Sequence, residues 1–159
     1  MKREPASTLG RYRGVVRKFE PRDAHRVDVV LRQSPEAAAW SVKSIEQLQQ
    51  RGEIAWVIEI ERGIAGFLVA RAVLSEAEIL NLAVDPSSRR RGLAAALLDA
   101  ASTEFQRQRV ETIFLEVRAS NRPAISFYEK YGFALNGRRP AYYQNPTEDA
   151  VLMTRELTG

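Results

Sequence analysis

The sequence predicts an α/β protein built on a mixed sheet, and two patterns carry this prediction. An apolar run over 78–84, a helical stretch after Gly92 and an apolar run over 112–117 follow one another. This order is typical of a βαβ crossover, which joins neighbouring parallel strands through a right-handed connection. Two further apolar runs, over 54–60 and 64–74, flank a turn and predict an antiparallel hairpin. Parallel and antiparallel pairs therefore share one sheet.

The chain ahead of the hairpin predicts one strand and two helices. The segment 15–19 favours a first strand, which Pro21 ends. Asp23 can open a helix whose apolar residues recur at helical spacing: Val27, Val30 and Leu31. Ser41 is a suitable N-cap, so we expect a second helix to begin there.

The second half of the chain completes the sheet. The crossover helix has an apolar residue every fourth position, which predicts one buried face: Leu93, Leu97, Ala101 and Phe105. Pro123 can start another helix, and Gly132 can end it as the left-handed residue after the last turn. Two terminal strands are expected near 133–138 and 150–157.

Composition limits the class of protein. A chain of 159 residues suits one domain, and we expect residues 1–13 to form a flexible basic arm before a single domain over 14–159. The sequence has no cysteine, which excludes disulfides and thiolate metal sites, and no metal site is predicted. Neither a leader peptide nor an apolar run of about 18 residues is evident, so the cytoplasm is the expected location.

The formal net charge of +4 favours anionic partners. A solvated basic surface explains this charge as well, and no nucleic-acid-binding motif accompanies it. Binding to nucleic acid or to a membrane is therefore not expected. The single histidine, His25, lies in a predicted surface helix and receives no role. We expect a monomer or a weak dimer.

The most informative segment is the turn between the crossover strand and helix, Arg89-Arg90-Arg91-Gly92-Leu93-Ala94. The opening of a helix leaves about four backbone N–H groups without partners, and they attract anions such as a pyrophosphate. Neither G-x-x-x-x-G-K-[ST] nor G-x-G-x-x-G is present, so nucleotide hydrolysis is not predicted. A solvated arginine loop is the alternative reading.

Two motifs in the same order resemble those of the GNAT N-acetyltransferases. Arg89-x-x-Gly92-x-Ala94 is similar to the family's coenzyme A loop, [RQ]-x-x-G-x-[GA]. The stretch Leu115-Glu116-Val117-Arg118 and the helix through Phe127-Tyr128-Glu129-Lys130-Tyr131-Gly132-Phe133 are similar to its RimI-like branch, the ribosomal-protein-alanine N-acetyltransferases. The resemblance covers about 15–157. It implies the GNAT fold: a central mixed, mostly antiparallel sheet of about seven strands, splayed at its middle parallel pair and flanked by about four helices.

The resemblance implies acetyl-coenzyme A as the cofactor and assigns residues to it. The backbone of the splayed strand would bind the pantetheine arm at Leu82, Ala83 and Val84. Backbone N–H groups of the loop would bind the pyrophosphate, with added positive charge from arginines: Arg89, Arg90, Arg91, Gly92, Leu93, Ala94 and Ala95. Asn121 matches a position that contacts the cofactor, although an N-cap role for it is almost as plausible.

The resemblance also assigns Glu116 as general base and Tyr128 as general acid. On its strand Glu116 lies opposite the apolar residues, and partial burial there would make its carboxylate a better base. From spacing alone, Glu116 could instead pair with Arg118, and Tyr128 could simply pack in the core beside Ile125. The family match favours the catalytic roles.

The acceptor side is expected at the last two strands. Tyr142 and Tyr143 fall between these strands, where related N-terminal acetyltransferases narrow the entrance for a peptide N-terminus. Two half-exposed hairpin aromatics are the alternative. Trp40 and Ser41 are the candidates for the opposite wall.

These features predict an acetyl-coenzyme A-dependent N-acetyltransferase acting on the N-terminal α-amino group of a protein, with a ribosomal protein as the candidate partner. Acetylation of lysine side chains or of a small amine is the alternative within enzymes. A non-catalytic ribosome- or RNA-associated binding module is the alternative from another class.

Overall fold

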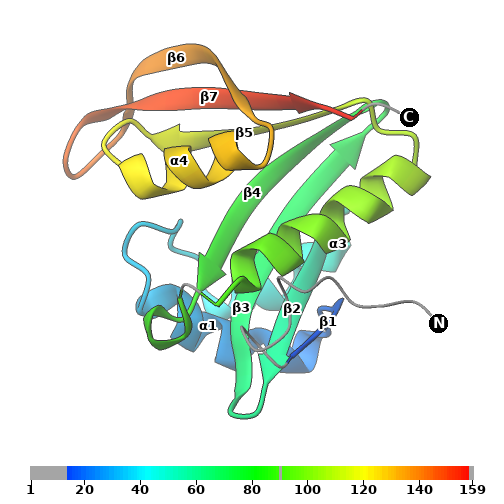
Figure 1. Cartoon of the computed structure of the whole chain (residues 1–159). Helices are drawn as coiled ribbons and strands as arrows, with labels where there is room; N and C mark the ends of the chain where they lie inside the picture. The colour runs from blue at the N-terminus through cyan, green and yellow to red at the C-terminus, as the bar shows by residue number, and fades with distance from the viewer. Residues whose placement is uncertain (1–13, 90, 158–159) are drawn as a thin grey trace. The chain divides into compact units, whose positions relative to one another are not determined.

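The computed structural model describes residues 14–89 and 91–157 (Figure 1). Its strands among these residues pair in the order β1-β2-β3-β4-β5-β7-β6, a mixed sheet of seven strands with β4 and β5 parallel. The elements are β1 Val15–Lys18, α1 Ala24–Arg32, α2 Val42–Glu46, β2 Ile54–Ile60, β3 Gly63–Val73, β4 Glu76–Val84, α3 Leu93–Arg107, β5 Thr112–Arg118, α4 Arg122–Lys130, β6 Ala134–Tyr143 and β7 Glu148–Glu156. The predicted α/β class, crossover and hairpin are confirmed.

The described chain forms two compact parts. One comprises residues 14–70 with 81–104, and the other comprises 71–80 with 105–157. Strands β3 and β4 and helix α3 contribute to both parts. No helix among the described residues is long and apolar enough to cross a membrane.

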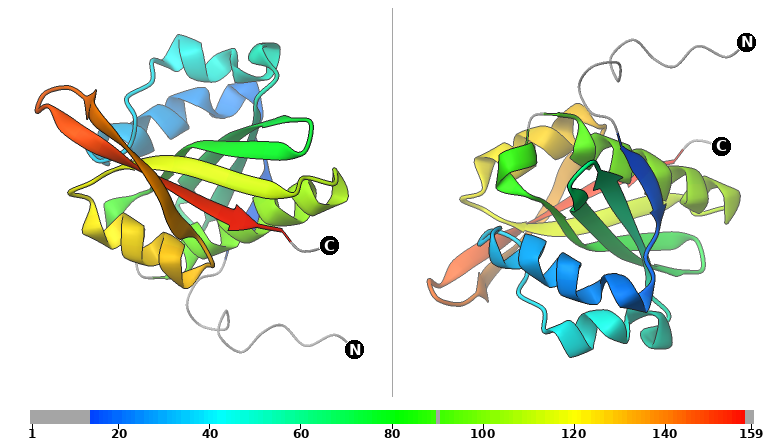
Figure 2. Two further views of the ribbon diagram at one scale, coloured as in Figure 1. Left: turned by 90° about the horizontal axis from the view of Figure 1, so that it is seen from above. Right: turned by 90° about the horizontal axis from the view of Figure 1, so that it is seen from below.

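The first part is built on the antiparallel β2–β3 hairpin. Helix α1 lies on one side of this hairpin and α3 on the other (Figure 1, Figure 2). The close approach of α3 depends on Gly66, because a Cβ there would lie 2.9 Å from Ile58 and 3.1 Å from Leu97. The predicted apolar stripe of α3 is buried throughout: Leu93, Leu97, Ala101 and Phe105.

The second part contains β5, β7 and β6, paired antiparallel in that order, with α4 beside them (Figure 2). Along β5 every second residue is buried, as the alternating sequence predicts. Helix α4 ends at Lys130 with Tyr131 as its C-cap, and Gly132 follows with φ +90°, the left-handed conformation expected of it.

The parallel register of β4 and β5 runs from Glu76 opposite Thr112 to Ile79 opposite Leu115. Both strands extend past this register, β4 to Val84 and β5 to Arg118. The predicted parallel pair is confirmed, and the splay beyond it stays a prediction.

The last strand lies close to its predicted position, but the predicted end of the strand before it was wrong. Strand β6 runs to Tyr143 instead of ending near Arg138, so Tyr142 and Tyr143 lie on the strand and not between strands. The register against β7 shifts between Arg139 and Tyr143, and Asp149 accepts the Ala141 N–H within that bulge. A bulge of this kind leaves no clear signal in a single sequence. The basic arm predicted over 1–13 lies outside the described residues.

Candidate functional site

The loop between β4 and α3 has the backbone of an anion cradle. Gly92 adopts φ +82°, which strongly favours glycine, and α3 begins at the next residue. The first backbone bond of the helix runs from the Ala96 N–H to the Gly92 carbonyl, at 3.0 Å. The N–H groups of the three residues before Ala96 therefore precede the intrahelical ladder: Leu93, Ala94 and Ala95. These donors fit a pyrophosphate.

Arg89, the first residue of the loop motif, is already engaged by protein groups. Its guanidinium forms an ion pair with Glu36, and its Nε lies 3.4 Å from the Val84 carbonyl. Both side chains of the ion pair are about two-fifths exposed. The positive charge expected from Arg89 is thus partly offset. Arg91 is half-buried, and Arg90 lies outside the described residues.

The end of β4 carries the residues predicted to bind the pantetheine arm. Ala83 and Val84 are buried and Leu82 is half-buried. The Val84 carbonyl accepts from the Ser34 hydroxyl at 3.4 Å as well as from Arg89. The Val84 carbonyl is thus engaged by protein groups.

Glu116 lies on β5 with its side chain only 13% exposed. Its Oε2 lies 2.8 Å from Arg139 Nε. This contact is an ion pair without a hydrogen bond, since the buried Oε2 has no hydrogen-bond partner among the described residues. A buried carboxylate oxygen without a hydrogen bond lowers the stability of the fold. Its free lone pairs can accept a hydrogen bond from a donor such as water or an amine.

The alternative pairing of Glu116 with Arg118 was wrong. Arg118 instead lies 3.3 Å from Glu148, donates to the Gln144 carbonyl, and stacks over Tyr143 with its Cζ 4.4 Å from the ring centroid. The partner of Glu116 is Arg139, which comes from β6.

Tyr128 lies on α4 and is 8% exposed. Its ring contacts Phe127 and Phe133 edge-on, with centroids 5.2 and 5.4 Å away. Burial raises the pKa of the Tyr128 hydroxyl above its usual value of 10.0, so the phenol keeps its proton at neutral pH. The Tyr128 ring packs in the core and its hydroxyl still carries a proton to donate. A packing role and a role as general acid are therefore compatible.

Tyr142 and Tyr143 form an edge-to-face pair with ring centroids 5.1 Å apart. Tyr142 is 49% exposed and lies beneath the guanidinium of Arg139, at 5.7 Å. Tyr143 is half-buried, and burial followed by the negative charge of Glu116 raises the pKa of its hydroxyl. Both tyrosines thus belong to the surroundings of Glu116.

The other acceptor candidates lie in the first compact part. Trp40 is half-buried, with the Arg51 guanidinium 5.5 Å from its ring centroid. The Ser41 hydroxyl accepts the Ser44 N–H at 3.1 Å, so it is the predicted N-cap of α2. Asn121 likewise caps α4, accepting the Ala124 N–H at 3.2 Å.

Comparison with known proteins identifies the family. The model of the acetyltransferase (GNAT) family matches residues 22–133. The chain belongs to the GNAT acetyltransferases. This GNAT protein is an acyltransferase that uses acetyl-coenzyme A as its acetyl donor.

Individual relatives extend the comparison. The GNAT chain is 37% identical over 130 residues to the [ribosomal protein bS18]-alanine N-acetyltransferase of Escherichia coli strain K12, covering 80% of this chain and 88% of the relative. It is 31% identical to an N-alpha-acetyltransferase of Saccharolobus solfataricus, over 71% of this chain and 75% of that one. The crystal structure of the ribosomal-protein-S18-alanine N-acetyltransferase from Escherichia coli superposes with a TM-score of 0.81 and 31% identity, covering 92% and 97% of the two chains. The GNAT fold is thereby confirmed.

Sequence reasoning missed two residues of this region. Arg139 comes close to Glu116 only through the register of β6, which the sequence does not reveal. Asn81 left a readable signal, because it is a polar residue on the buried face of β4, where Ala77, Ile79 and Ala83 also lie.

Proposed function

We propose that this GNAT acetyltransferase acts on the α-amino group at the N-terminus of a protein, with Glu116 as general base and Tyr128 as general acid. The observation that carries the proposal is the Glu116 carboxylate, which is nearly buried and keeps one oxygen without a hydrogen bond. The names of the relatives support the class of acceptor.

Glu116 is suited to removing a proton from an α-ammonium group. The α-amino pKa is about 8, whereas that of lysine is about 10.4, so an α-amine needs the weaker base at neutral pH. The Arg139 side chain is 60% exposed and can move into solvent. Glu116 Oε2 then accepts the proton from the amine, directly or through one water.

Tyr128 supplies the second proton. The amine nitrogen would bond to the acetyl carbon as the carbon–sulfur bond breaks, and the Tyr128 hydroxyl would donate its proton to the departing sulfur. The remaining excess proton of the new amide nitrogen would return through water to the Tyr128 oxygen, and Glu116 would release its proton to solvent. Because burial raises the pKa of this phenol, the hydroxyl is protonated at neutral pH and ready to donate. The Val84 N–H is assigned to the carbonyl oxygen. No covalent bond to the protein is needed.

The donor is assigned to the first compact part. Acetyl-coenzyme A supplies an activated acetyl thioester. The backbone N–H groups that follow Gly92 are assigned to its pyrophosphate, because they precede the helical ladder and the glycine lets the backbone come close. The charges of Arg89, Arg90 and Arg91 assist, and the backbone of Leu82, Ala83 and Val84 is assigned to the pantetheine arm.

The acceptor is assigned to aromatic residues near the base. Tyr142 and Tyr143 are proposed to line the entrance for a peptide N-terminus, and Trp40 and Ser41 to contact the peptide. The relative's name points to a ribosomal protein that begins with alanine as the candidate acceptor. A single domain over 14–159, a cytoplasmic location and a monomeric or weakly dimeric state stay predictions.

The test compares one peptide in two forms. A peptide that begins with alanine and contains one internal lysine is offered with a free or with a blocked N-terminus, together with acetyl-coenzyme A. We expect acetylation of the free form at its α-amine, located by fragmentation mass spectrometry, and none of the blocked form. Lysine acetylation of the blocked form would favour the alternative enzyme activity. Turnover of no amine, with RNA still bound, would favour the binding module.

A further inference from the structure

The segment between α1 and α2, residues 33–41, is hydrogen-bonded directly to the end of β4. The Asn81 amide nitrogen donates to the Ala38 carbonyl at 3.0 Å. Three residues further along β4, the Val84 carbonyl accepts from the Ser34 hydroxyl at 3.4 Å. Asn81 is 7% exposed and Ser34 1%. The Ser34 bond is buried, and the Asn81 bond joins a buried side chain to the exposed Ala38. We call residues 33–41 the α1–α2 segment.

The loop after β4 holds the same segment at a third point. The Arg89 guanidinium pairs with Glu36 and also approaches the Val84 carbonyl. Arg89 therefore links the loop, the strand end and the segment. Because both side chains of the pair are about two-fifths exposed, we expect it to be weaker than the bond from the buried Asn81 side chain. Asn81 therefore makes the stronger contact with the α1–α2 segment, and Arg89 the weaker one.

The assigned chemistry does not use the Asn81 side chain, and it gives Arg89 only an assisting charge beside the pyrophosphate. The Asn81 side chain leaves β4 on its buried face and directs its donor to Ala38, two residues before Trp40. A buried amide donor that lost its acceptor would be costly, which makes this contact directional and specific. The α1–α2 segment ends at Trp40 and Ser41, the residues assigned to the peptide.

We propose that Asn81 and Arg89 are positioning residues for the acceptor: they hold the α1–α2 segment against the strand and loop assigned to coenzyme A. The main contribution of Arg89 is thus to the segment and not to the pyrophosphate. This inference rests on the proposed function only where it assigns the peptide to Trp40 and Ser41. The contacts of Asn81 and Arg89 with the α1–α2 segment exist in the protein without any acceptor.

The first test is Asn81→Asp, which keeps the size of the side chain and replaces the amide donor by a carboxylate oxygen facing the Ala38 carbonyl. Loss of a hydrogen bond predicts a rise of about tenfold in KM for the peptide. The KM for acetyl-coenzyme A is expected to stay within about twofold, since the N–H groups after Gly92 are untouched. A merely structural residue would instead lower the melting temperature and alter both constants together, and that result would overturn the proposal.

The second test exchanges the charges of the ion pair. Arg89→Glu and Glu36→Arg are each expected to raise KM for the peptide, and the double variant to restore it. The matched control is the exposed pair of Arg71 and Glu78, 3.1 Å apart in the other compact part, whose exchange should leave both constants unchanged. A raised KM for acetyl-coenzyme A in Arg89→Glu that the double variant does not restore would assign Arg89 to the phosphates and overturn its positioning role.

A readout without acceptor separates this inference from the proposed function. Hydrogen–deuterium exchange of the free enzyme is expected to speed up at amides 34–41 in Asn81→Asp, with β2 and β3 unchanged. If the wild-type enzyme acetylates no peptide N-terminus, the proposed function fails. The exchange measurement still tests whether Asn81 holds the α1–α2 segment in place. Unchanged exchange over 34–41 would overturn this positioning role.

Discussion

The loop after β4 offers backbone groups for binding, whereas the β5–α4 region offers side chains. In the loop, the backbone after Gly92 offers the anion donors, whereas the side chains bind one another: Asp85 accepts from Ser87, and Arg89 pairs with Glu36. In the β5–α4 region the backbone is taken up by strand and helix, and side chains are left for chemistry. For predicting an anion site, the run of arginines is therefore less informative than the glycine that follows it.

Burial separates the two regions in the same way. The Arg89–Glu36 pair is about two-fifths exposed, and such a pair contributes little to stability or affinity. Glu116 and Tyr128 are 13% and 8% exposed. Water screens the first pair and hardly reaches the second two groups, so we expect substitutions in the β5–α4 region to have the larger effects.

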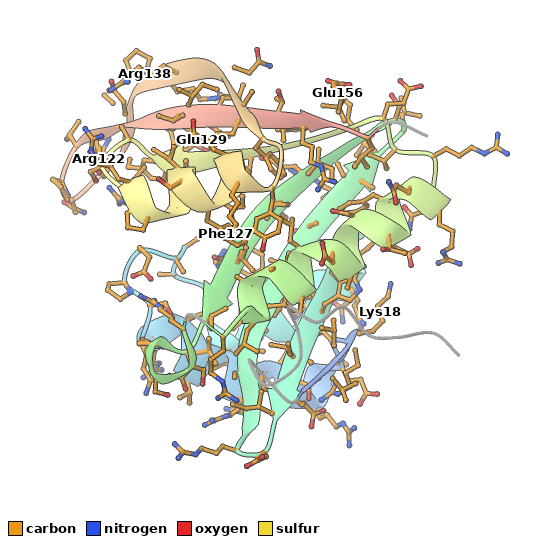
Figure 3. All side chains as sticks on the ribbon, in the orientation of Figure 1. Lys18, Arg122, Phe127, Glu129, Arg138 and Glu156 are labelled. Carbon is orange, nitrogen blue, oxygen red and sulfur yellow. The ribbon has the colours of Figure 1, made fainter. Side chains whose placement is uncertain are left out.

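The largest effect is expected for Glu116→Gln. The amide keeps the shape of the side chain but cannot accept the proton, so kcat should fall by about 10²- to 10⁴-fold, measured with saturating peptide and acetyl-coenzyme A. The KM for acetyl-coenzyme A should hardly change. Glu129→Gln is the matched control, because Glu129 is exposed and leaves α4 on a different side from Phe127 (Figure 3). A wild-type kcat in Glu116→Gln would place the base elsewhere.

Tyr128→Phe should lower kcat by about 10²-fold, the lower end of the range for one acid–base group. The ring contacts to Phe127 and Phe133 survive this change, so stability should be nearly preserved. Burial raises the pKa of Tyr128, so the proton is lost only above the usual value of 10.0. Deprotonation of Tyr128 should therefore not lower kcat between pH 7 and pH 10. If the wild-type kcat falls in this range and the fall is absent from Tyr128→Phe, the role of Tyr128 as general acid is contradicted.

The sequence was sufficient where a local rule decided the structure. Ser41 and Asn121 cap their helices because a side-chain oxygen there can reach a free N–H, and Gly132 is left-handed because it has no Cβ. The alternation along β5 placed Glu116 opposite the buried residues. Each of these outcomes depends on only a few neighbouring residues.

The sequence was insufficient where pairing between distant strands decided the structure. Arg139 approaches Glu116 only because β6 lies opposite β7 in one register, with Arg139 facing Ala150 and a bulge on each side. The local rule favoured Arg118 instead, two residues from Glu116 on the same face. Strand register depends on the packing of whole strands, which periodicity alone does not specify.

Gly92→Val tests whether the backbone carries the donor side. A β-branched residue is strained at φ +82°, so the loop should lose at least one charge-assisted hydrogen bond to the pyrophosphate. The Kd of coenzyme A, measured by calorimetry, should rise about 10- to 100-fold. Arg90→Ala should raise it less. Gly52→Val is the matched control, because Gly52 has φ +80° and open space around it, far along the chain from the loop. Equal losses in the two valine variants would mean that strain, and not the loop, lowers affinity.

The smallest effect is expected at Asn121, which decides between capping and a cofactor contact. Asn121→Ala removes the bond to the Ala124 N–H and should destabilise the protein by about 1 kcal/mol in urea unfolding. Asn121→Asp retains a capping oxygen, so stability should return to near the wild-type value. If capping is its whole role, the Kd of coenzyme A is the same in Asn121→Asp as in the wild type. Weaker binding in this stable variant would instead show that the amide donates to the cofactor, and the β5–α4 region would then share the anchoring that we assign to the loop.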